Sequence, residues 1–286
     1  MSKIISDYRC FFCFTRAYER LLEKEPLTQE QKSEFVKKMA QKYQQVSEDF
    51  SAPEYSRDLR NIFQTYSNTQ DLYVEEKNIS NELALSLYPE LKKMVTQSDN
   101  PKETALRLAL AGNVIDFGVH AEYDLEQSIK KGLETPFAID NSPELFNRIS
   151  QAKTILYLGD NSGEIVLDKL FLETLQHSNV YFAVRGAPVL NDVTIHDAKY
   201  VGIDSVAQVI SNGGDVPSTV LSLATPEFLK VFQQADLIIS KGQGNLEGLW
   251  GTVYDKIFFL SMVKCDVVAD AVGVPKGSFV VMKQDT

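Results

Sequence analysis

Polar residues that could bind a metal ion follow two apolar runs of the sequence. Asp160 and Asn161 lie in GDNSGE, directly after ILYL, while Asn191 and Asp192 end RGAPVLND, directly after VYFAV. Carboxylate and amide oxygens suit hard ions such as Mg²⁺ or Mn²⁺, and neither stretch contains a Cys or His that would favour zinc. The alternative is that Asp160 and Asn161 cap one helix and Asp192 caps the next.

Cations and glycines follow the apolar runs as well. Arg185 comes directly after VYFAV, and Lys241, Gly242 and Gly244 come directly after LIIS. Backbone N–H groups at such glycines could bind an anion. A hard metal beside an anion site indicates phosphoryl chemistry, in which the metal polarises the phosphate and positions or deprotonates water. Two alternatives stay open, namely an Asp160 nucleophile that forms an aspartyl-phosphate and a Lys241 that is simply an exposed lysine.

The elements that would position these residues begin at about Lys153. From there, short apolar runs alternate with helical stretches, and the candidate strands are TILYLG, NVYFAVR, AQVIS, DLIISK, IFFLSMV and SFVVM. Continuous apolar strands separated by helices predict a doubly wound, mostly parallel sheet in an α/β/α sandwich. Ligands bind at the carboxyl ends of such strands. The loops GDNSGE, RGAPVLND, SNGGD and KGQGN all fall there, so we expect a binding site at this edge.

The chain before Lys153 has helical periodicity throughout. Helices are expected to start at Asp7, at Thr28 (with Gln31 completing a capping box), at SAPE, at Asp71, near Pro101 and around Leu125, and Pro89 is expected to interrupt or kink the fourth. We therefore predict an all-helical module over residues 1–150 and an α/β domain over residues 151–286.

Composition limits the class of protein. The 286 residues carry a net charge of −10 and are 44% hydrophobic, which argues against a nucleic-acid partner or an anionic membrane surface, since both favour a basic face. No secretory signal or run long enough to span a bilayer is visible. Three cysteines, an odd number, argue against a disulfide scaffold, so a cytoplasmic location is expected. The oligomeric state is not indicated.

Several stretches together resemble one protein family. GDNSGEIVLD, RGAPVLNDVTIHDA, SNGGD, ADLIISKGQGN and VKCDVVADAVGV, with CFFC and AGNVIDFG before them, are similar to the metal-dependent damage-control phosphatases (DUF89). The match is to the branch with a CxxC motif in archaea and bacteria, in the same order over nearly the whole chain. The resemblance implies a helical region packed on an α/β/α core. It also implies hydrolysis of small phosphorylated metabolites, such as sugar phosphates or phosphopantetheine-related compounds, with Mg²⁺, Mn²⁺ or a similar ion such as Co²⁺ or Ni²⁺.

The resemblance also assigns roles to residues. It places the metal ligands, which are also the catalytic residues, at Asp160, Asn161 and Asp192. It implies that Lys241 approaches the substrate phosphate. The other implied substrate-binding residues are Gly242, Asn245, Asn113, Asp116, Glu164 and Arg185.

Two other classes of function are weighed against a phosphatase. An apolar strand, a glycine turn and a helix, as in ILYLGDNSGE, also begin the cofactor site of many S-adenosylmethionine-dependent methyltransferases. Against this, Asp160 and Asn161 fill the turn, and Arg185 and Gly186 stand where an acidic residue would bind the ribose. A non-catalytic metabolite-binding protein is the third class.

Cys10 and Cys13 form a CxxC pair on one face of the first helix. We favour packing of this face against the α/β domain. A metal site built from three cysteines, or from mixed ligands, is the second interpretation. A redox pair is disfavoured because no strand precedes Cys10. Cys265, inside an apolar stretch, is expected to be a small buried side chain.

Overall fold

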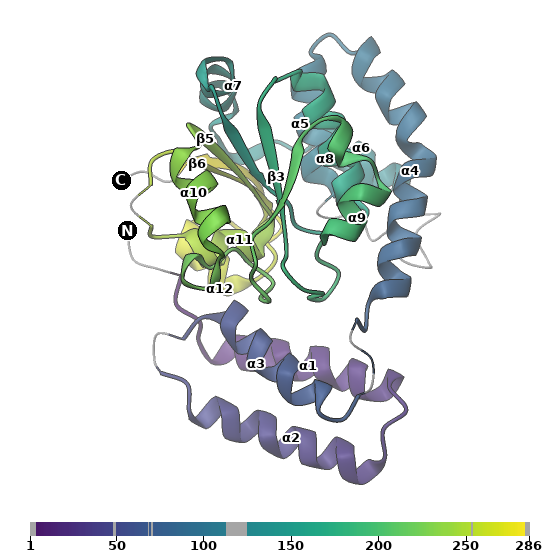
Figure 1. Ribbon diagram of the computed structural model, residues 1–286, viewed down its shortest axis with the longest axis vertical. Helices are drawn as coiled ribbons and strands as arrows, with labels where there is room; N and C mark the ends of the chain where they lie inside the picture. The colour runs from purple at the N-terminus through teal and green to yellow at the C-terminus, as the bar shows by residue number, and fades with distance from the viewer. Residues whose placement is uncertain are drawn as a thin grey trace.

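Figure 1 shows the computed structural model, which describes residues 4–47, 50–67, 69, 71–112, 125–252 and 254–283. Its strands form one seven-stranded sheet in the order β1-β7-β6-β5-β2-β3-β4. They are β1 (Phe137–Asp140), β2 (Ile155–Leu158), β3 (Val180–Val184), β4 (Gln208–Ser211), β5 (Leu237–Lys241), β6 (Ile257–Met262) and β7 (Phe279–Lys283). All neighbouring strands are parallel except β6 and β7. The predicted α/β fold class is confirmed.

Helices cover both faces of this sheet. One face packs against α4 (Val74–Gln97), α5 (Pro101–Gly112), α6 (Leu125–Glu134), α7 (Ser142–Gln151), α8 (Glu164–Leu175) and α9 (Ile195–Tyr200). The other packs against α10 (Pro226–Gln234), α11 (Gly242–Leu249) and α12 (Asp266–Val272). Two short 3₁₀ helices, η2 (Ile203–Ser205) and η3 (Leu221–Leu223), complete the described elements. Successive residues of β2 alternate between the faces, because Tyr157 joins the first core and Leu156 and Leu158 the second.

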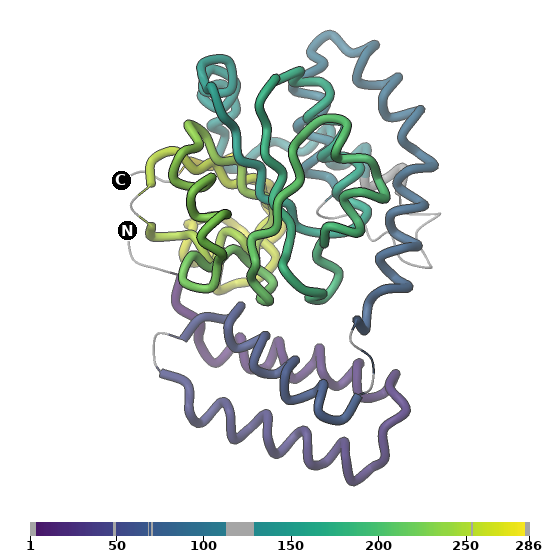
Figure 2. The backbone as a smooth tube through the Cα atoms, viewed as in Figure 1, coloured from purple at the N-terminus to yellow at the C-terminus, as the bar shows by residue number. Residues whose placement is uncertain are grey.

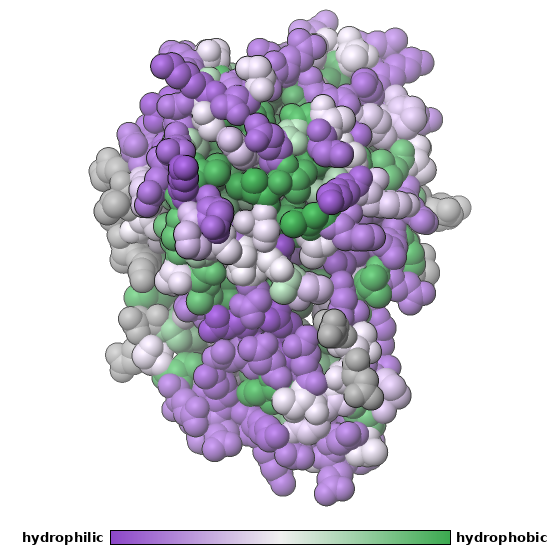
Figure 3. All heavy atoms as spheres, viewed as in Figure 1, coloured by the Kyte–Doolittle hydropathy of each residue, from purple (hydrophilic) through white to green (hydrophobic). Residues whose placement is uncertain are grey.

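The first three helices form a separate unit. They are α1 (Tyr8–Lys24), α2 (Gln29–Gln44) and α3 (Ala52–Gln64), and they share an aromatic core that includes Tyr18, Phe35 and Phe63. Figure 2 shows this three-helix unit below the sheet, with α4 leading away from it along the side of the α/β part. Its outer surface in Figure 3 is mostly hydrophilic. The unit is therefore held by its own apolar core and meets the rest of the chain on one side.

Local sequence signals explain where these helices start. Asp7 accepts a hydrogen bond from the backbone N–H of Arg9 at 2.8 Å, and Thr28 and Gln31 form the predicted capping box. Ser51 caps α3. The fourth helix continues through Pro89, which does not end it. None of the described helices combines the length and the apolar character that a membrane-spanning helix needs.

One strand was not indicated by the sequence. β1 lies within the segment expected to be helical, pairs only with β7, and is four residues long with alternating partly buried and exposed side chains. Such a short edge strand leaves little periodic pattern to detect. Because β1 and helices α4–α6 pack with the sheet, the apolar cores group the chain differently from the predicted division at residues 150 and 151, which stays a prediction.

Candidate functional site

A pocket of about 280 Å³ lies where the strand-end loops meet the three-helix unit. Asp160, Asn161 and Asp192 line it from the loops after β2 and β3. The opposite walls come from Phe14 of α1 and Ser56 of α3, and further residues come from α11 and the loop after β6. We call this the acidic pocket. Its position at the carboxyl edge of the sheet agrees with the expectation from the sequence.

Backbone contacts bring the two loops together. The N–H of Val193 donates to the carbonyl of Asp160 at 2.8 Å, and the N–H of Ser162 donates to the carbonyl of Asn191 at 2.9 Å. Between these two bonds, Asn161 and Asp192 form an isolated antiparallel bridge. The chain thus places residues that are about thirty positions apart in the sequence on one wall.

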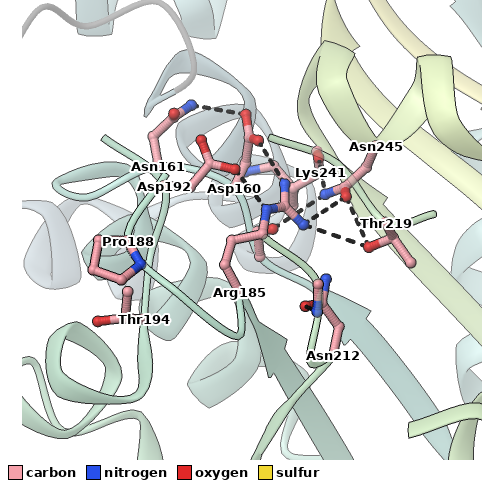
Figure 4. A network of polar contacts seen from close by, with 12 residues as sticks. Asp160, Asn161, Arg185, Pro188, Asp192, Thr194, Asn212, Thr219, Lys241 and Asn245 are labelled. Carbon is pink, nitrogen blue, oxygen red and sulfur yellow. Dashed lines mark hydrogen bonds and ion pairs between the residues drawn. The ribbon is translucent and has the colours of Figure 1, made fainter. Parts of the chain in front are cut away.

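Arg185 connects the two carboxylates from behind. Its side chain is 2% exposed, and its Nε donates to Oδ2 of Asp192 at 2.6 Å. Its Nη2 contacts Oδ1 of Asp160 at 3.4 Å, and its Nη1 donates to Oδ1 of Asn245 at 2.9 Å, as Figure 4 shows. Asn245 in turn donates to the carbonyl of Gly159 at 3.1 Å. Arg185 and Asn245, both predicted to bind substrate, therefore hold the carboxylates and the strand end in place.

Asn161 links the pocket to a second polar group. Its Nδ2 donates to Oδ2 of Asp160 at 2.7 Å and to Oε2 of Glu164 at 3.1 Å. Glu164 is fully buried in the first turn of α8. It lies behind Asn161 rather than in the lining of the acidic pocket, as far as the structure describes that lining.

Lys241 is completely buried beside Glu164. Its Nζ lies 2.6 Å from Glu164 and 2.6 Å from Asp168, and it donates to the carbonyl of Ala109 at 2.8 Å. The interpretation of Lys241 as an exposed lysine is therefore wrong. Its predicted contact with a substrate phosphate stays a prediction, because Lys241 is not among the described residues that line the acidic pocket.

Among the residues that the structure describes, the buried charges around the pocket do not balance. The buried carboxyl groups are Asp160, Glu164, Asp168 and Asp192, and the buried cations among these contacts are Arg185 and Lys241. Burial, followed by repulsion from Asp192 and Glu164, raises the pKa of Asp160 to about 7. Burial also raises the pKa of Asp168 to about 6, although Lys241 opposes this change. The described part of the site therefore has more buried carboxyl groups than buried cations, a balance that additional positive charge would improve.

Helix capping does not account for these polar loops. The N-cap of α8 is Gly163, with φ at 76°, and its N–H donates to Oδ1 of Asn81 at 2.8 Å. The cap of α9 is Thr194, which forms a capping box with Asp197. The alternative in which Asp192 caps this helix is therefore wrong, and Asn81 of α4 supports the loop before α8.

Gly242 permits a close approach that no other residue allows. Its φ is 77°, and a Cβ atom at this position would lie 1.9 Å from Oδ2 of Asp160. A side chain would displace the carboxylate or the start of α11. Gly242 thus brings the first turn of α11 against Asp160.

The sequence did not point to three polar residues, Gln243, Glu247 and Lys264, that line the pocket from α11 and the loop after β6. Lys264 follows β6 and is exposed, and its N–H donates to Oε1 of Gln243 at 2.7 Å. Gln243 also donates to Oε1 of Glu247 at 2.7 Å, and burial raises the pKa of Glu247 to about 7. All three line the acidic pocket. The signal that could have found Lys264 was its place after a strand, within the stretch VKCDVVADAVGV.

The remaining residues singled out in the sequence are two predicted substrate-binding residues and the three cysteines. Asn113 and Asp116 lie outside the described residues. Cys10 and Cys265 are half-buried free thiols, and Cys13 is an exposed one. Within the described part of the chain, no three His, Cys, Asp or Glu side chains are grouped as a metal site. The described residues thus contain no three-cysteine or mixed-ligand cluster at the CxxC pair.

The fold and the pocket together define a doubly wound α/β protein with an oxygen-rich acidic site at its strand ends. A family profile described as the damage-control phosphatase ARMT1-like domain matches residues 6–280. The protein named damage-control phosphatase PH1575, from Pyrococcus horikoshii, is 37% identical over 222 residues, which cover 76% of both chains. A damage-control phosphatase from Archaeoglobus fulgidus is 33% identical over 218 residues, covering 74% of this chain and 75% of that one.

A solved structure agrees with the sequence matches. The crystal structure of a DUF89 family protein (PH1575) from Pyrococcus horikoshii superposes with a TM-score of 0.89, at 32% identity over 100% of both chains. This chain belongs to the damage-control phosphatase ARMT1-like family. The resemblance seen in the sequence is confirmed, and family membership favours a phosphatase over a methyltransferase or a non-catalytic binding protein.

Proposed function

We propose that this chain is a divalent-metal-dependent phosphatase that hydrolyses phosphate monoesters of small metabolites. The observation that carries the proposal is the acidic pocket of a chain in the damage-control phosphatase family. In that pocket the oxygen-bearing side chains of Asp160, Asn161 and Asp192 share one wall. These three residues would hold the metal ion.

The residues present fit such an ion. Mg²⁺ is commonly bound by one or two carboxylates and keeps several waters, so two aspartates and an amide are a sufficient set. The excess of buried carboxyl groups, expressed in the pKa of about 7 for Asp160, favours a cation at this place. A bound divalent ion would supply Lewis acidity toward the phosphate and lower the pKa of water. Mn²⁺, Co²⁺ and Ni²⁺ suit the same oxygen ligands.

The phosphate would be bound by Lys264. Among the described residues that line the acidic pocket, Lys264 is the one Lys, Arg or His. It is exposed, so its ammonium group can reach a ligand without leaving buried carboxylates unpaired. Gln243 and Gly244, in the first turn of α11, also line the pocket, where backbone N–H groups favour an anion. Lys241 would support the site from below through Glu164.

Glu247 is suited to protonate the leaving alcohol. It lines the same pocket, and its pKa of about 7 keeps it partly protonated near neutral pH. In the hydrolysis, the oxygen of water bonds to phosphorus, the ester P–O bond breaks, and the departing oxygen takes a proton. A carboxyl group held near neutrality by burial can donate that proton.

The test is a phosphate-release assay over a panel of sugar and cofactor phosphates. Protein stripped by chelator should be inactive and should recover activity with Mg²⁺, Mn²⁺, Co²⁺ or Ni²⁺. Asp192→Asn should abolish this recovery, while Asp204→Asn, a change of an exposed carboxylate in η2, should not affect it. Full activity in excess chelator after extensive dialysis would refute the metal requirement.

A further inference from the structure

A second cavity adjoins the acidic pocket. It has a volume of about 240 Å³ and lies between α1, α3, residues 71–73 and residues 188–190. We call it the apolar chamber. Phe14, Ser56 and Leu190 line both cavities, so the two spaces meet across these side chains. A molecule whose phosphate lies beside Asp160 could extend past Leu190 into the chamber.

The walls of the chamber are mostly hydrophobic. They include Tyr18, Leu21, Phe63 and Leu72. A cavity of about 150 Å³ lined by apolar side chains is large enough for benzene. The chamber is larger, so it can accept an aromatic or branched aliphatic group, and burying such a group is favourable at about 25 cal/mol for each Å² of apolar surface.

One polar atom in the chamber wall has no hydrogen-bond partner among the residues that the structure describes. Arg60 donates through Nη1 to the carbonyl of Pro188 at 3.1 Å and pairs through Nη2 with Asp215 at 2.8 Å. Its Nε is buried and has no hydrogen-bond partner among the described residues. A buried donor left unsatisfied is unfavourable. A ligand that presents an oxygen or nitrogen acceptor to Arg60 would remove this cost.

Leu190 stands at the junction in a strained conformation. Its φ is 47°, in the left-handed region that a leucine rarely adopts, and its side chain is 41% exposed. Backbone strain of this kind persists where the surrounding structure enforces it and occurs often at ligand sites. Leu190 thus presents an apolar side chain to both the acidic pocket and the apolar chamber.

We propose that the apolar chamber binds the alcohol part of the substrate, which selects phosphate monoesters of bulky, largely apolar alcohols, with a further gain where the alcohol carries a hydrogen-bond acceptor. This inference rests on the proposed phosphatase function and specifies its substrate class. The phosphate lies in the acidic pocket, the carbon skeleton passes Leu190, and an acceptor atom, where the alcohol has one, meets Nε of Arg60. Esters of short alcohols fill only the acidic pocket and make no contacts with the side chains that line the apolar chamber.

The test compares ethyl phosphate with naphthylethyl phosphate, whose leaving alcohols are similar in acidity. Wild-type protein should prefer the naphthylethyl ester by about tenfold or more in kcat/KM, as expected for filling an apolar pocket. Ala17→Trp places a bulky side chain at the edge of the chamber and not at the acidic pocket, since the exposed Ala17 lines only the former. It should remove the preference and leave the kcat/KM for ethyl phosphate unchanged. Arg20→Trp, an exposed change on the same helix that lines neither cavity, is the matched control.

A binding measurement separates this proposal from the phosphatase assignment. Cys13 lines the chamber and is exposed, so its modification by N-ethylmaleimide can be followed by peptide mass spectrometry. Naphthylethylphosphonate, which cannot be hydrolysed, should slow the modification of Cys13, whereas ethylphosphonate should not. Equal protection by both compounds, or an undiminished ester preference in Ala17→Trp, would overturn the proposal. If neither ester is hydrolysed with any divalent ion, the phosphatase function fails, and protection of Cys13 alone decides on the chamber.

Discussion

Two clusters of charged and polar residues meet at the loop between β2 and α8, and they differ in whether they line the acidic pocket. The pocket cluster, which consists of Asp160, Asn161, Asp192 and Arg185, has three of its members on the wall of the acidic pocket. The inner cluster, which consists of Glu164, Asp168 and Lys241, is completely buried. Asn161 joins the two through its hydrogen bond to Glu164.

The difference between the clusters shows how burial decides the role of a charged side chain. In the inner cluster Lys241 has two carboxylates within 2.6 Å and a carbonyl at 2.8 Å, so its donors serve the fold. In the pocket cluster Asp160 and Asp192 both contact Arg185, and both line the acidic pocket, where a ligand could reach them. Lys241 at the end of β5 is thus paired inside the fold, while its predicted contact with a substrate phosphate stays a prediction and the exposed Lys264 is our proposed phosphate ligand.

The largest effect is expected from breaking the inner cluster. Lys241→Met should lower the free energy of unfolding by about 3–5 kcal/mol, because it leaves Glu164 and Asp168 buried without their cation. Urea denaturation followed by circular dichroism measures this change. If the Lys241→Met protein is as stable as the wild type and only its KM is raised, Lys241 binds the phosphate. The proposed difference between the inner cluster and the pocket cluster would then be wrong.

The next effect concerns the pocket cluster. Asp160→Ala should lower kcat by about 100-fold to 1000-fold, the scale on which one preorganised electrostatic group acts, and should weaken metal binding. Gly242 packs directly against this carboxylate, so alanine removes atoms from a crowded place without adding any. Circular dichroism should show an intact fold. Metal affinity equal to that of the wild type would remove Asp160 from the set of ligands.

The pH dependence of metal binding should identify the same group. Because the pKa of Asp160 is raised to about 7, the metal competes with a proton below that pH, and affinity should fall about tenfold per pH unit between pH 7 and 5. The raised pKa also means that metal-free protein loses stability as the pH rises from about 4 through 7, since the folded state holds the proton more tightly than the unfolded state does. Calorimetric titration and thermal melting at several pH values measure both effects. A metal affinity that does not change over this range would contradict the assignment.

The smallest effect is expected at Lys264. Lys264→Ala should raise KM by about tenfold, the size of one charge-assisted hydrogen bond to the phosphate, with no measurable change in stability because the side chain is exposed. Lys276→Ala, a change of another exposed lysine in the α/β part, is the control for altered net charge. A loss of stability comparable to that of Lys241→Met would show that both lysines are structural.

Local chemistry made much of the fold predictable. The caps at Asp7 and Thr28 and the six apolar strands from β2 to β7 were visible in the sequence, because caps and strand patterns act over a few residues. The edge strand β1 was not visible, since four residues that pair on one side carry almost no pattern. The grouping of α4–α6 with the sheet also depended on packing between distant segments.

The sequence by itself determined that Asp160, Asn161 and Asp192 belong at one edge of a parallel sheet, because strand order and strand direction place loops there regardless of side-chain detail. Only the tertiary structure decided which charged groups face the pocket. Arg185 and Lys241 both end strands in the sequence, yet each is buried against carboxylates, whereas Lys264 is exposed. The physical reason is that the pairing and solvation of a charge depend on neighbours far along the chain, which no local pattern specifies.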